Sequence, residues 1–167
     1  RRRNVPHLSQ KMSKGFSYKI RELQLADVPL VVELGQQAFN DQTLPLLHRT
    51  WGETEVLNNY TSDPEFCLVA ESNGKVIGFT LGSFMLPDPS KRNVKAYGWL
   101  LWIAVSRKHQ RNGVAKKLTD KLARRFKQAG AEFMLVNSDE GNTSAVDLFE
   151  KSGFKTESRH VYLTRKL

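Results

Sequence analysis

The order of apolar and polar residues along the chain alternates between the spacing of helices and that of strands. Asp27 followed by Val28 and Pro29 predicts a helix start, because Asp favours the N-cap position and Pro favours the first turn. Asn73-Gly74 between two β-rich runs predicts a hairpin, since both residues tolerate positive φ. The full pattern predicts helices after Asp27 and over residues 53–60, 114–129 and 143–151, and strands over 18–23, 66–71, 75–85, 97–105, 132–137, 154–155 and 160–164.

This order of elements predicts an α/β fold with a mixed sheet and helices on both of its faces. Residues 97–105 are apolar on both faces of the expected strand, which is typical of a strand at the centre of a sheet. The 167 residues contain no visible linker, so we expect one domain over residues 17–167. Residues 1–16 begin with three arginines and show no helical or strand period, and we expect them to form a disordered extension.

Composition narrows the class of protein. The chain is 40% hydrophobic and 26% charged, which is ordinary globular usage, and it has no run of about 18 apolar residues that would predict a membrane span. Cys67 is the only cysteine, lies in an apolar run and is expected to be a buried small side chain; a single cysteine favours a reducing, cytoplasmic location. The four histidines have no metal-ligand spacing, so no metal is expected.

The net charge of +9 is concentrated in one part of the sequence. Residues 91–128 carry twelve lysines and arginines but only one acid, Asp120. Such a patch attracts polyanions, and charge alone leaves nucleic acid, anionic lipid and a phosphate-rich cofactor open as partners.

A polar and basic loop with Gly113 at its end joins the strand over 97–105 to the helix that begins at Val114. The first backbone N–H groups of a helix lack intrahelical partners, and the helix dipole adds positive potential, so this turn is suited to an oxyanion. A glycine there allows close approach of a phosphate. From the loop alone, an ordinary strand-to-helix turn with a solvated basic rim is an equally good interpretation. The chain has neither the Walker pattern nor the dinucleotide fingerprint.

Two motifs in this half of the chain are similar to those of a known family. The segment Gln110-Arg111-Asn112-Gly113-Val114-Ala115 follows an apolar strand and resembles the Gln/Arg-x-x-Gly-x-Gly/Ala motif that binds acetyl-CoA in the GNAT superfamily of N-acetyltransferases. The segment from Asn142 to Phe154 resembles a second signature of that superfamily, Asn-x-x-Ala followed by Glu-Lys-x-Gly-Phe. The resemblance covers roughly residues 17–167. It implies a GNAT-like, mostly antiparallel central sheet flanked by helices on both faces.

The resemblance also implies where acetyl-CoA, the cosubstrate, would bind. Main-chain groups of Ile103, Ala104 and Val105 would pair with the pantetheine arm at a bulge in the strand. The cofactor-binding residues implied by the two motifs are Ile103, Ala104, Val105, Gln110, Arg111, Asn112, Gly113, Val114, Ala115, Asn142 and Phe149.

Three positions that carry catalytic groups in members of this superfamily hold other residues here. Phe149 stands where many members have a tyrosine acid, and Asn137 and Trp99 align with glutamates that act as bases in two subfamilies. None of the three can move a proton in the same way. The resemblance leaves direct attack of a neutral amine on the thioester, with Tyr162 and a water near Asp139 as the candidate catalytic groups.

The leading hypothesis is therefore an N-acetyltransferase acting on a primary amine. A protein N-terminus or a lysine, rather than a small molecule, is the alternative acceptor. In this superfamily the loop that carries His48 and Trp51 lines the acceptor pocket. An acyl-CoA-binding sensor without catalysis and a basic nucleic-acid-binding module are the alternatives from other classes. We expect no specific nucleic acid and no membrane as partners, and a homodimer stays open.

Overall fold

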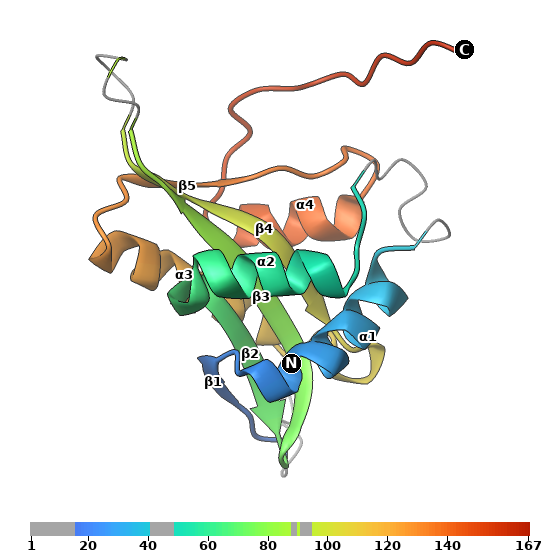
Figure 1. Ribbon diagram of the computed structural model, residues 1–167, viewed down its shortest axis with the longest axis vertical. Coiled ribbons are helices and arrows are strands. Elements are labelled where there is room, and N and C mark those ends of the chain that lie inside the picture. The colour runs from blue at the N-terminus through green and yellow to red at the C-terminus, as the bar shows by residue number, and fades with distance from the viewer. Residues whose placement is uncertain (1–15, 41–48, 88–89, 91–94) are drawn as a thin grey trace, which may run out of the picture.

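The computed structural model describes residues 16–40, 49–87, 90 and 95–167, and its strands form one mixed sheet in the order β1-β2-β3-β4-β5 (Figure 1). The first four strands pair antiparallel, and β5 is parallel to β4. The strands are β1 (Lys19–Glu22), β2 (Cys67–Ser72), β3 (Lys75–Met85), β4 (Tyr97–Val105) and β5 (Phe133–Val136), and the α-helices are α1 (Val28–Ala38), α2 (Glu53–Ser62), α3 (Val114–Gln128) and α4 (Thr143–Lys151). The predicted α/β class, the mostly antiparallel sheet and four helices are confirmed.

Helices cover both faces of the sheet, as the sequence predicted. Val31 of α1 and Val56 of α2 are fully buried against Phe79 and other side chains on one face. Leu118 and Leu122 of α3 belong to the core on the other face, together with Phe149 of α4. In Figure 1, α1 and α2 lie in front of the sheet, and α3 and α4 lie behind it.

Helix α3 packs closely against the strands because glycines face it. A Cβ atom on Gly98 of β4 would lie 2.1 Å from the Phe126 ring, and one on Gly82 of β3 would lie 2.7 Å from the same ring. Phe126 is buried and also stacks on Phe66 with ring centroids 4.6 Å apart. This contact fixes α3, and with it the loop before α3, relative to β4.

A β-bulge in β4 reverses the faces of the sheet toward which the following side chains of this strand point. Register shifts between the pairs Leu81–Trp102 and Gly82–Leu100, so Leu101 is the extra residue. Leu100 packs in the core on the α3 side, whereas Trp102 packs in the core on the α1 side. Two positions of the same parity therefore face opposite sides of the sheet, which is the effect of one inserted residue.

The two expected strands after α4 are not formed, so that prediction is wrong. Residues 154–167 contain neither helix nor strand, and the segment runs away from the body of the molecule in Figure 1. Val161, Tyr162 and Leu163 are at least two-thirds exposed. A period-two pattern indicates a strand only when a neighbouring strand pairs with it, and these residues have no such pairing in the sheet.

The start of the ordered domain also differs slightly from expectation. Phe16 belonged to the expected disordered extension, yet its ring stacks on His109 with centroids 5.4 Å apart and approaches Tyr18. The rest of that expected extension, residues 1–15, lies outside the described residues.

A partly buried ion-pair network joins the start of α1 to the sheet. Arg21 of β1 donates to both carboxylate oxygens of Asp27, at 2.6 and 2.9 Å, and its Nε donates to Glu71 of β2 at 2.6 Å. The Asp27 carboxylate also accepts the backbone N–H of Gln24 at 2.8 Å. The hydrogen bond from Arg21 is the main cause that holds the pKa of Asp27 below its usual value.

This network gives a prediction for stability. A lowered pKa in the folded state adds stability above the ordinary aspartate pKa of about 3.9, and that stability is lost as the pH falls through the folded pKa. We therefore expect Asp27→Asn to lower the free energy of unfolding by about 1–3 kcal/mol at pH 7 and to flatten its acid dependence below about pH 4. Urea denaturation between pH 7 and pH 3 measures both. Asp120→Asn, which removes the exposed Lys116–Asp120 pair, serves as the control and should change less than about 1 kcal/mol. Equal losses in the two variants would contradict the assigned network.

Candidate functional site at the divergence of two strands

Strands β4 and β5 pair over only four residues and then separate. The last pair joins Leu100 to Val136, so residues 101–105 of β4 have no β5 partner. This stretch contains the bulge and the three residues Ile103, Ala104 and Val105 that were expected to pair with a pantetheine arm. The structure thus contains the expected bulge and the expected separation, and binding of a ligand by these three residues stays a prediction.

The loop after β4 is folded on itself by its own polar groups. The Gln110 side chain donates to the carbonyl of Val105 at 3.0 Å, and Asn112 donates to the carbonyl of Gln110 at 3.1 Å. Ser106 and His109 share a side-chain hydrogen bond of 2.6 Å. The side chains of Gln110 and Asn112 therefore shape the loop, and the backbone amides of these two residues are the groups left to bind a ligand.

Gly113 ends the loop in the left-handed conformation, with φ of 76°, and is the N-cap residue of α3. As a glycine, the N-cap residue has no side chain to cap this helix, and the first turn contains no acidic residue. Among the described residues, apart from its chain neighbours, no atom lies within 4 Å of a Cβ built on Gly113, so a side chain at this position would point into open space. An open, uncapped helix start with the amides of Val114 and Ala115 fits a phosphate group.

The surroundings of this turn are cationic. Arg107, Lys108 and Arg111 are exposed around it, and Arg111 has a φ of 62°, so two left-handed residues shape the turn. Successive amides in such conformations form concave anion sites. The residues from Gln110 to Ala115 thus have the chemistry that the pyrophosphate of acetyl-CoA requires, and their contact with that group stays a prediction.

The two predicted cofactor residues of the second motif have structural roles in the described chain. Asn142 is the N-cap of α4, and its Oδ1 accepts the backbone N–H of Ala145 at 3.3 Å. Phe149 is only 6% exposed and makes an edge contact with Phe154, with ring centroids 5.5 Å apart. A contact between either residue and acetyl-CoA stays a prediction.

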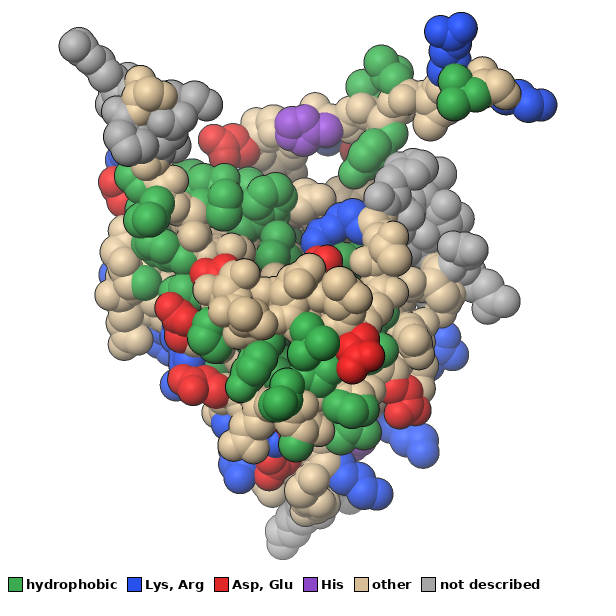
Figure 2. Space-filling view, viewed as in Figure 1, with side chains coloured by type: hydrophobic (Ala, Val, Ile, Leu, Met, Phe, Trp, Pro, Cys, Tyr) green, Lys and Arg blue, Asp and Glu red, His purple; other side chains and the backbone are tan. Residues whose placement is uncertain are grey.

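The two candidate catalytic residues lie in different segments, Asp139 before α4 and Tyr162 after it. Asp139 is exposed, and its Oδ1 accepts the backbone N–H of Gly141 at 2.7 Å, which stabilises the turn before α4. Tyr162 is 67% exposed in the C-terminal segment, which stands clear of the body with an opening beneath it in Figure 2. Tyr162 interacts electrostatically with Arg49, and that places it near the α2 side of the sheet.

Two of the three positions that lack a catalytic group are neighbours in space. The indole N–H of Trp99 on β4 donates to the Asn137 side chain, just after β5, at 3.2 Å. Both residues thus lie at the beginning of the strand separation, where the Trp99 indole N–H uses the side-chain oxygen of Asn137. Neither residue is ionisable at physiological pH, so the source of proton transfer must be another group.

A polar cluster that the sequence analysis missed lies on the α2 side of β4. The Arg49 guanidinium lies 4.0 Å above the Trp102 ring and donates to the Leu101 carbonyl at 3.2 Å. Glu55 accepts the Trp102 indole N–H at 2.6 Å and lies 3.5 Å from the second Arg49 nitrogen. Burial lowers the pKa of Arg49, and Glu55 and Tyr162 offset part of this effect. In the sequence, Arg49 and Glu55 stand close to the predicted acceptor loop, which was the available signal for this cluster. Their spacing in the sequence did not show that the two side chains interact.

The acceptor loop itself is described in part. His48, one of its two expected acceptor-lining residues, lies outside the described residues. Trp51, the other one, donates its indole N–H to the Val32 carbonyl at 2.9 Å and stacks on Phe79 with centroids 5.3 Å apart. Its ring fills the space beside Gly35, where a Cβ would lie 2.0 Å from it. Trp51 also makes an edge contact with Trp102 of the Arg49 cluster, with ring centroids 5.0 Å apart.

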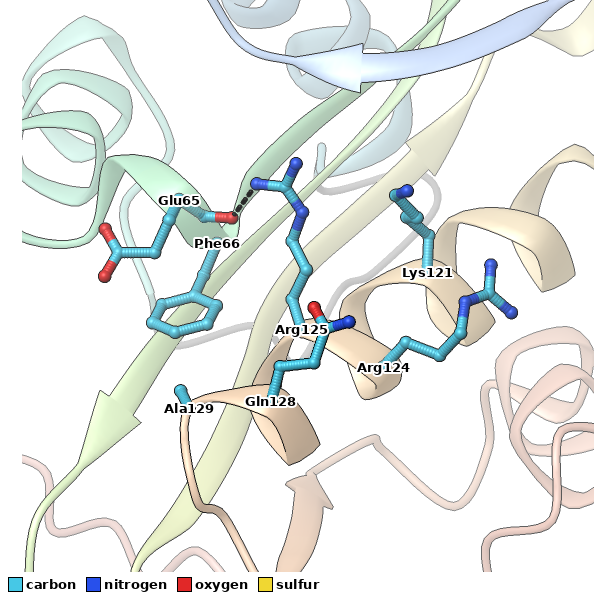
Figure 3. Close-up of a pocket in the computed structure, with 7 residues that line it drawn as sticks. All are labelled: Glu65, Phe66, Lys121, Arg124, Arg125, Gln128 and Ala129. Carbon is cyan, nitrogen blue, oxygen red and sulfur yellow. Dashed lines mark hydrogen bonds between the residues drawn. The ribbon is translucent and has the colours of Figure 1, made fainter.

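A second, basic groove of about 420 Å³ lies on the C-terminal half of α3, far along the helix from Gly113. Figure 3 shows Lys121, Arg124 and Arg125 on the helix side and Glu65 opposite, with the Glu65 carboxylate directed away from Lys121 and Arg124. Arg125 is already paired, because it donates to the Glu65 carbonyl at 2.6 Å and to Glu22 at 2.7 Å. The basic residues of segment 91–128 thus include one group around the start of α3 and a separate group on the C-terminal half of that helix.

The described residues give little support for a reactive cysteine, a metal site or a membrane-spanning helix. Cys67 is buried, and burial raises the pKa of its thiol to about 12, so thiolate chemistry at neutral pH is disfavoured. No group of three or more histidine, cysteine, aspartate or glutamate side chains suited to a metal occurs among the residues that the structure describes. Within those same residues no helix is both long and apolar enough to cross a membrane.

Comparison with known proteins decides the family. The family model described as acetyltransferase (GNAT) family matches residues 32–154, which include β4, the Gly113 turn and α4. The chain belongs to the GNAT acetyltransferase family. An N-alpha-acetyltransferase of Sulfurisphaera tokodaii is 27% identical over 160 residues, covering 89% of this chain and 88% of that protein.

Two further matches are a relative that the chain covers only in part and a solved structure. Human N-acetyltransferase 8B is 28% identical over 110 residues, and the match covers 65% of this chain and 47% of that protein, so the chain corresponds to about half of it. The crystal structure of Ard1 from Thermoplasma volcanium superposes with a TM-score of 0.69 at 22% identity and covers 86% of each chain. This structural likeness supports the GNAT fold of the chain.

Proposed function

We propose that this GNAT domain transfers the acetyl group of acetyl-CoA to a primary amine. The observation that carries the proposal is the start of α3, where Gly113 leaves an uncapped helix terminus open to a phosphate. The separation of β4 from β5 directly before this turn supports it, because residues 101–105 have no β5 partner, although residues 102–105 pair with β3 on their other side. Family membership supports the same donor.

The residues fit a donor that extends from the helix start to the strand separation. Backbone amides of residues 111–115 would hold the pyrophosphate, and Arg107 and Lys108 would add positive charge beside it. Ile103, Ala104 and Val105 would bind the pantetheine arm through their main chain. The thioester would then lie near Leu101, next to the bulge and the Arg49 cluster.

The proposed reaction forms one bond and breaks one bond. The amine nitrogen forms a C–N bond to the acetyl carbon while the C–S bond to coenzyme A breaks. The nitrogen loses a proton, and the departing thiolate gains one. Holding the two reactants side by side supplies much of the rate, since an oriented pair avoids the entropy of a bimolecular encounter.

A peptide α-amine is the acceptor class that we favour over a lysine or a small molecule. The relative from Sulfurisphaera tokodaii carries the name N-alpha-acetyltransferase. Chemistry supports the same choice, because an α-amino group has a pKa of about 7.7–8.0, against about 10.4 for lysine, and is far more often neutral at pH 7. A cytoplasmic location and the absence of a specific nucleic-acid or membrane partner stay predictions, and a homodimer stays open.

Release of the coenzyme A thiol tests the proposal. We expect acetyl-CoA turnover with a tetrapeptide that has a free α-amino group, and at least tenfold less with the same peptide blocked at its N-terminus. A blocked peptide containing one lysine and an aminoglycoside represent the other acceptor classes. Acetyl-CoA binding in calorimetry without turnover on the whole panel would favour the acyl-CoA sensor, and absence of binding would reject the donor.

A further inference from the structure

We infer that Glu55 is a catalytic residue that receives the acceptor as its ammonium ion and takes one proton from it. This inference rests on the proposed function, because it assigns the acceptor side of the same site. The carboxylate is held at the strand separation by Arg49 and Trp102. It fills the role left open by Trp99 and Asn137, which bind each other.

The geometry leaves one oxygen of Glu55 available. Oε1 accepts the Trp102 indole N–H at 2.6 Å and faces the Arg49 guanidinium at 3.5 Å. Oε2 has no hydrogen-bond partner among the residues that the structure describes, and the Glu55 side chain is 31% exposed. The carboxylate is thus fixed in orientation by one oxygen and able to accept a hydrogen bond from a ligand with the other.

Arg49 connects this carboxylate to the place where the donor is expected. Its Nη1 donates to the carbonyl of Leu101, the extra residue of the β4 bulge and the first residue beyond the β4–β5 pairing. Trp102 follows Leu101 directly and supplies the other contact to Glu55. Glu55 is therefore connected to the strand separation through the Arg49 side chain. It lies on the side of the sheet that α2 covers, whereas the start of α3 lies on the opposite side.

The other candidate groups are less suited to this role. The Asp139 carboxylate is used in the turn before α4, and Tyr162 is a phenol in an exposed segment. The two carboxylate oxygens of Asp63 accept hydrogen bonds from the Ser83 hydroxyl and the Phe84 backbone N–H. Among these acids, Glu55 alone combines a fixed orientation, a free oxygen and a connection to the bulge.

The proton balance follows from this placement. An ammonium ion that reaches Glu55 transfers one proton to Oε2 and becomes the neutral amine, and Glu55 passes that proton to water. The nitrogen then forms the C–N bond as the C–S bond breaks, and the second proton lost by nitrogen goes to the coenzyme A thiolate. The charged and titratable groups that face Glu55 in the described chain are Arg49 directly and Tyr162 through Arg49.

The test compares Glu55→Gln with Glu53→Gln in the same turn of α2. Both substitutions remove one acidic group from the first turn of the helix, but Glu53 is exposed and makes no hydrogen bond or ion pair in the described structure. With acetyl-CoA and the free tetrapeptide, we expect Glu55→Gln to lower kcat/KM at pH 7 by about hundredfold or more. Glu53→Gln should stay within about twofold of the parent, and Glu55→Asp should recover part of the activity.

The pH profile separates proton transfer from a structural role. Between pH 6 and 8 the parent should change little, because bound ammonium is a competent substrate, whereas Glu55→Gln should lose about tenfold per pH unit below the amine pKa of about 8. Acetyl-CoA affinity in calorimetry and the Tm should equal those of the parent. Parallel pH profiles, or a loss no larger than that of Glu53→Gln, would overturn the role of Glu55 while leaving the proposed function intact. If the unsubstituted protein binds acetyl-CoA but acetylates no amine, both the role of Glu55 and the proposed function are overturned.

Discussion

Gly113→Val should lower the affinity for acetyl-CoA by at least about hundredfold, which corresponds to about 2.8 kcal/mol. The Cβ position of Gly113 faces open space at the uncapped start of α3, and a branched side chain there would occupy the volume that a phosphate needs. The substitution also disturbs the turn, because φ at this residue is 76°, a left-handed conformation that costs a branched residue about 1–2 kcal/mol. Calorimetric titration with acetyl-CoA measures the loss.

The control for this strain lies at the other end of the same helix. Gly130 has a φ of 97°, and a Cβ there also meets no atom within 4 Å. Gly130→Val should therefore lose a similar amount of stability but keep its acetyl-CoA affinity within about threefold, because it lies at the opposite end of α3 from the turn that we propose binds the phosphate. If Gly113→Val binds acetyl-CoA as the parent does, the donor does not use this turn. If both variants lose affinity equally, strain rather than filled space is the cause.

Most of the fold was predictable because its elements carry strong local signals. The Asp27-Val28-Pro29 start, the Asn73-Gly74 hairpin and the apolar run of β4 all appear in the structure as expected. The failure came at residues 160–164, where alternation alone predicted a strand. Helices form their hydrogen bonds within one segment, but a strand depends on a partner elsewhere, and no local pattern shows whether that partner is present.

The backbone conformation of the candidate site was predictable from the sequence. The contacts between side chains that are distant in the sequence were not. The Gly113 turn follows from a short motif with a conformational requirement, and the structure shows the left-handed glycine that this motif needs. The Arg49–Glu55–Trp102 cluster joins the segment before α2 to the middle of β4, which are about fifty positions apart in the sequence. The bulge at Leu101 decides which side of the sheet Trp102 faces, and a strict period of two would have placed it on the wrong face.

An acidic residue in the first turn of α3 should separate ligand binding from stability. Ala115 is the second residue of α3, and the turn contains no acid in the natural sequence. A carboxylate at this position interacts favourably with the helix dipole and stabilises a helix by about 0.3–1 kcal/mol. The same charge repels a bound pyrophosphate. We therefore expect Ala115→Glu to weaken acetyl-CoA binding by about hundredfold while leaving the Tm equal to that of the parent or slightly higher.

Ala115→Gln is the matched variant, because it has the same size as the glutamate variant and no charge. It should lose at most about tenfold in affinity, so the remaining difference between the two variants measures repulsion. That difference should shrink as the salt concentration rises, since ions screen charges on an exposed turn within a Debye length of about 10 Å at 0.1 M. Isothermal titrations of both variants at 0.05 and 0.5 M salt give the comparison. Equal affinities for the two variants at low salt would mean that no phosphate approaches the start of α3, because a charge this close to a bound pyrophosphate must affect it.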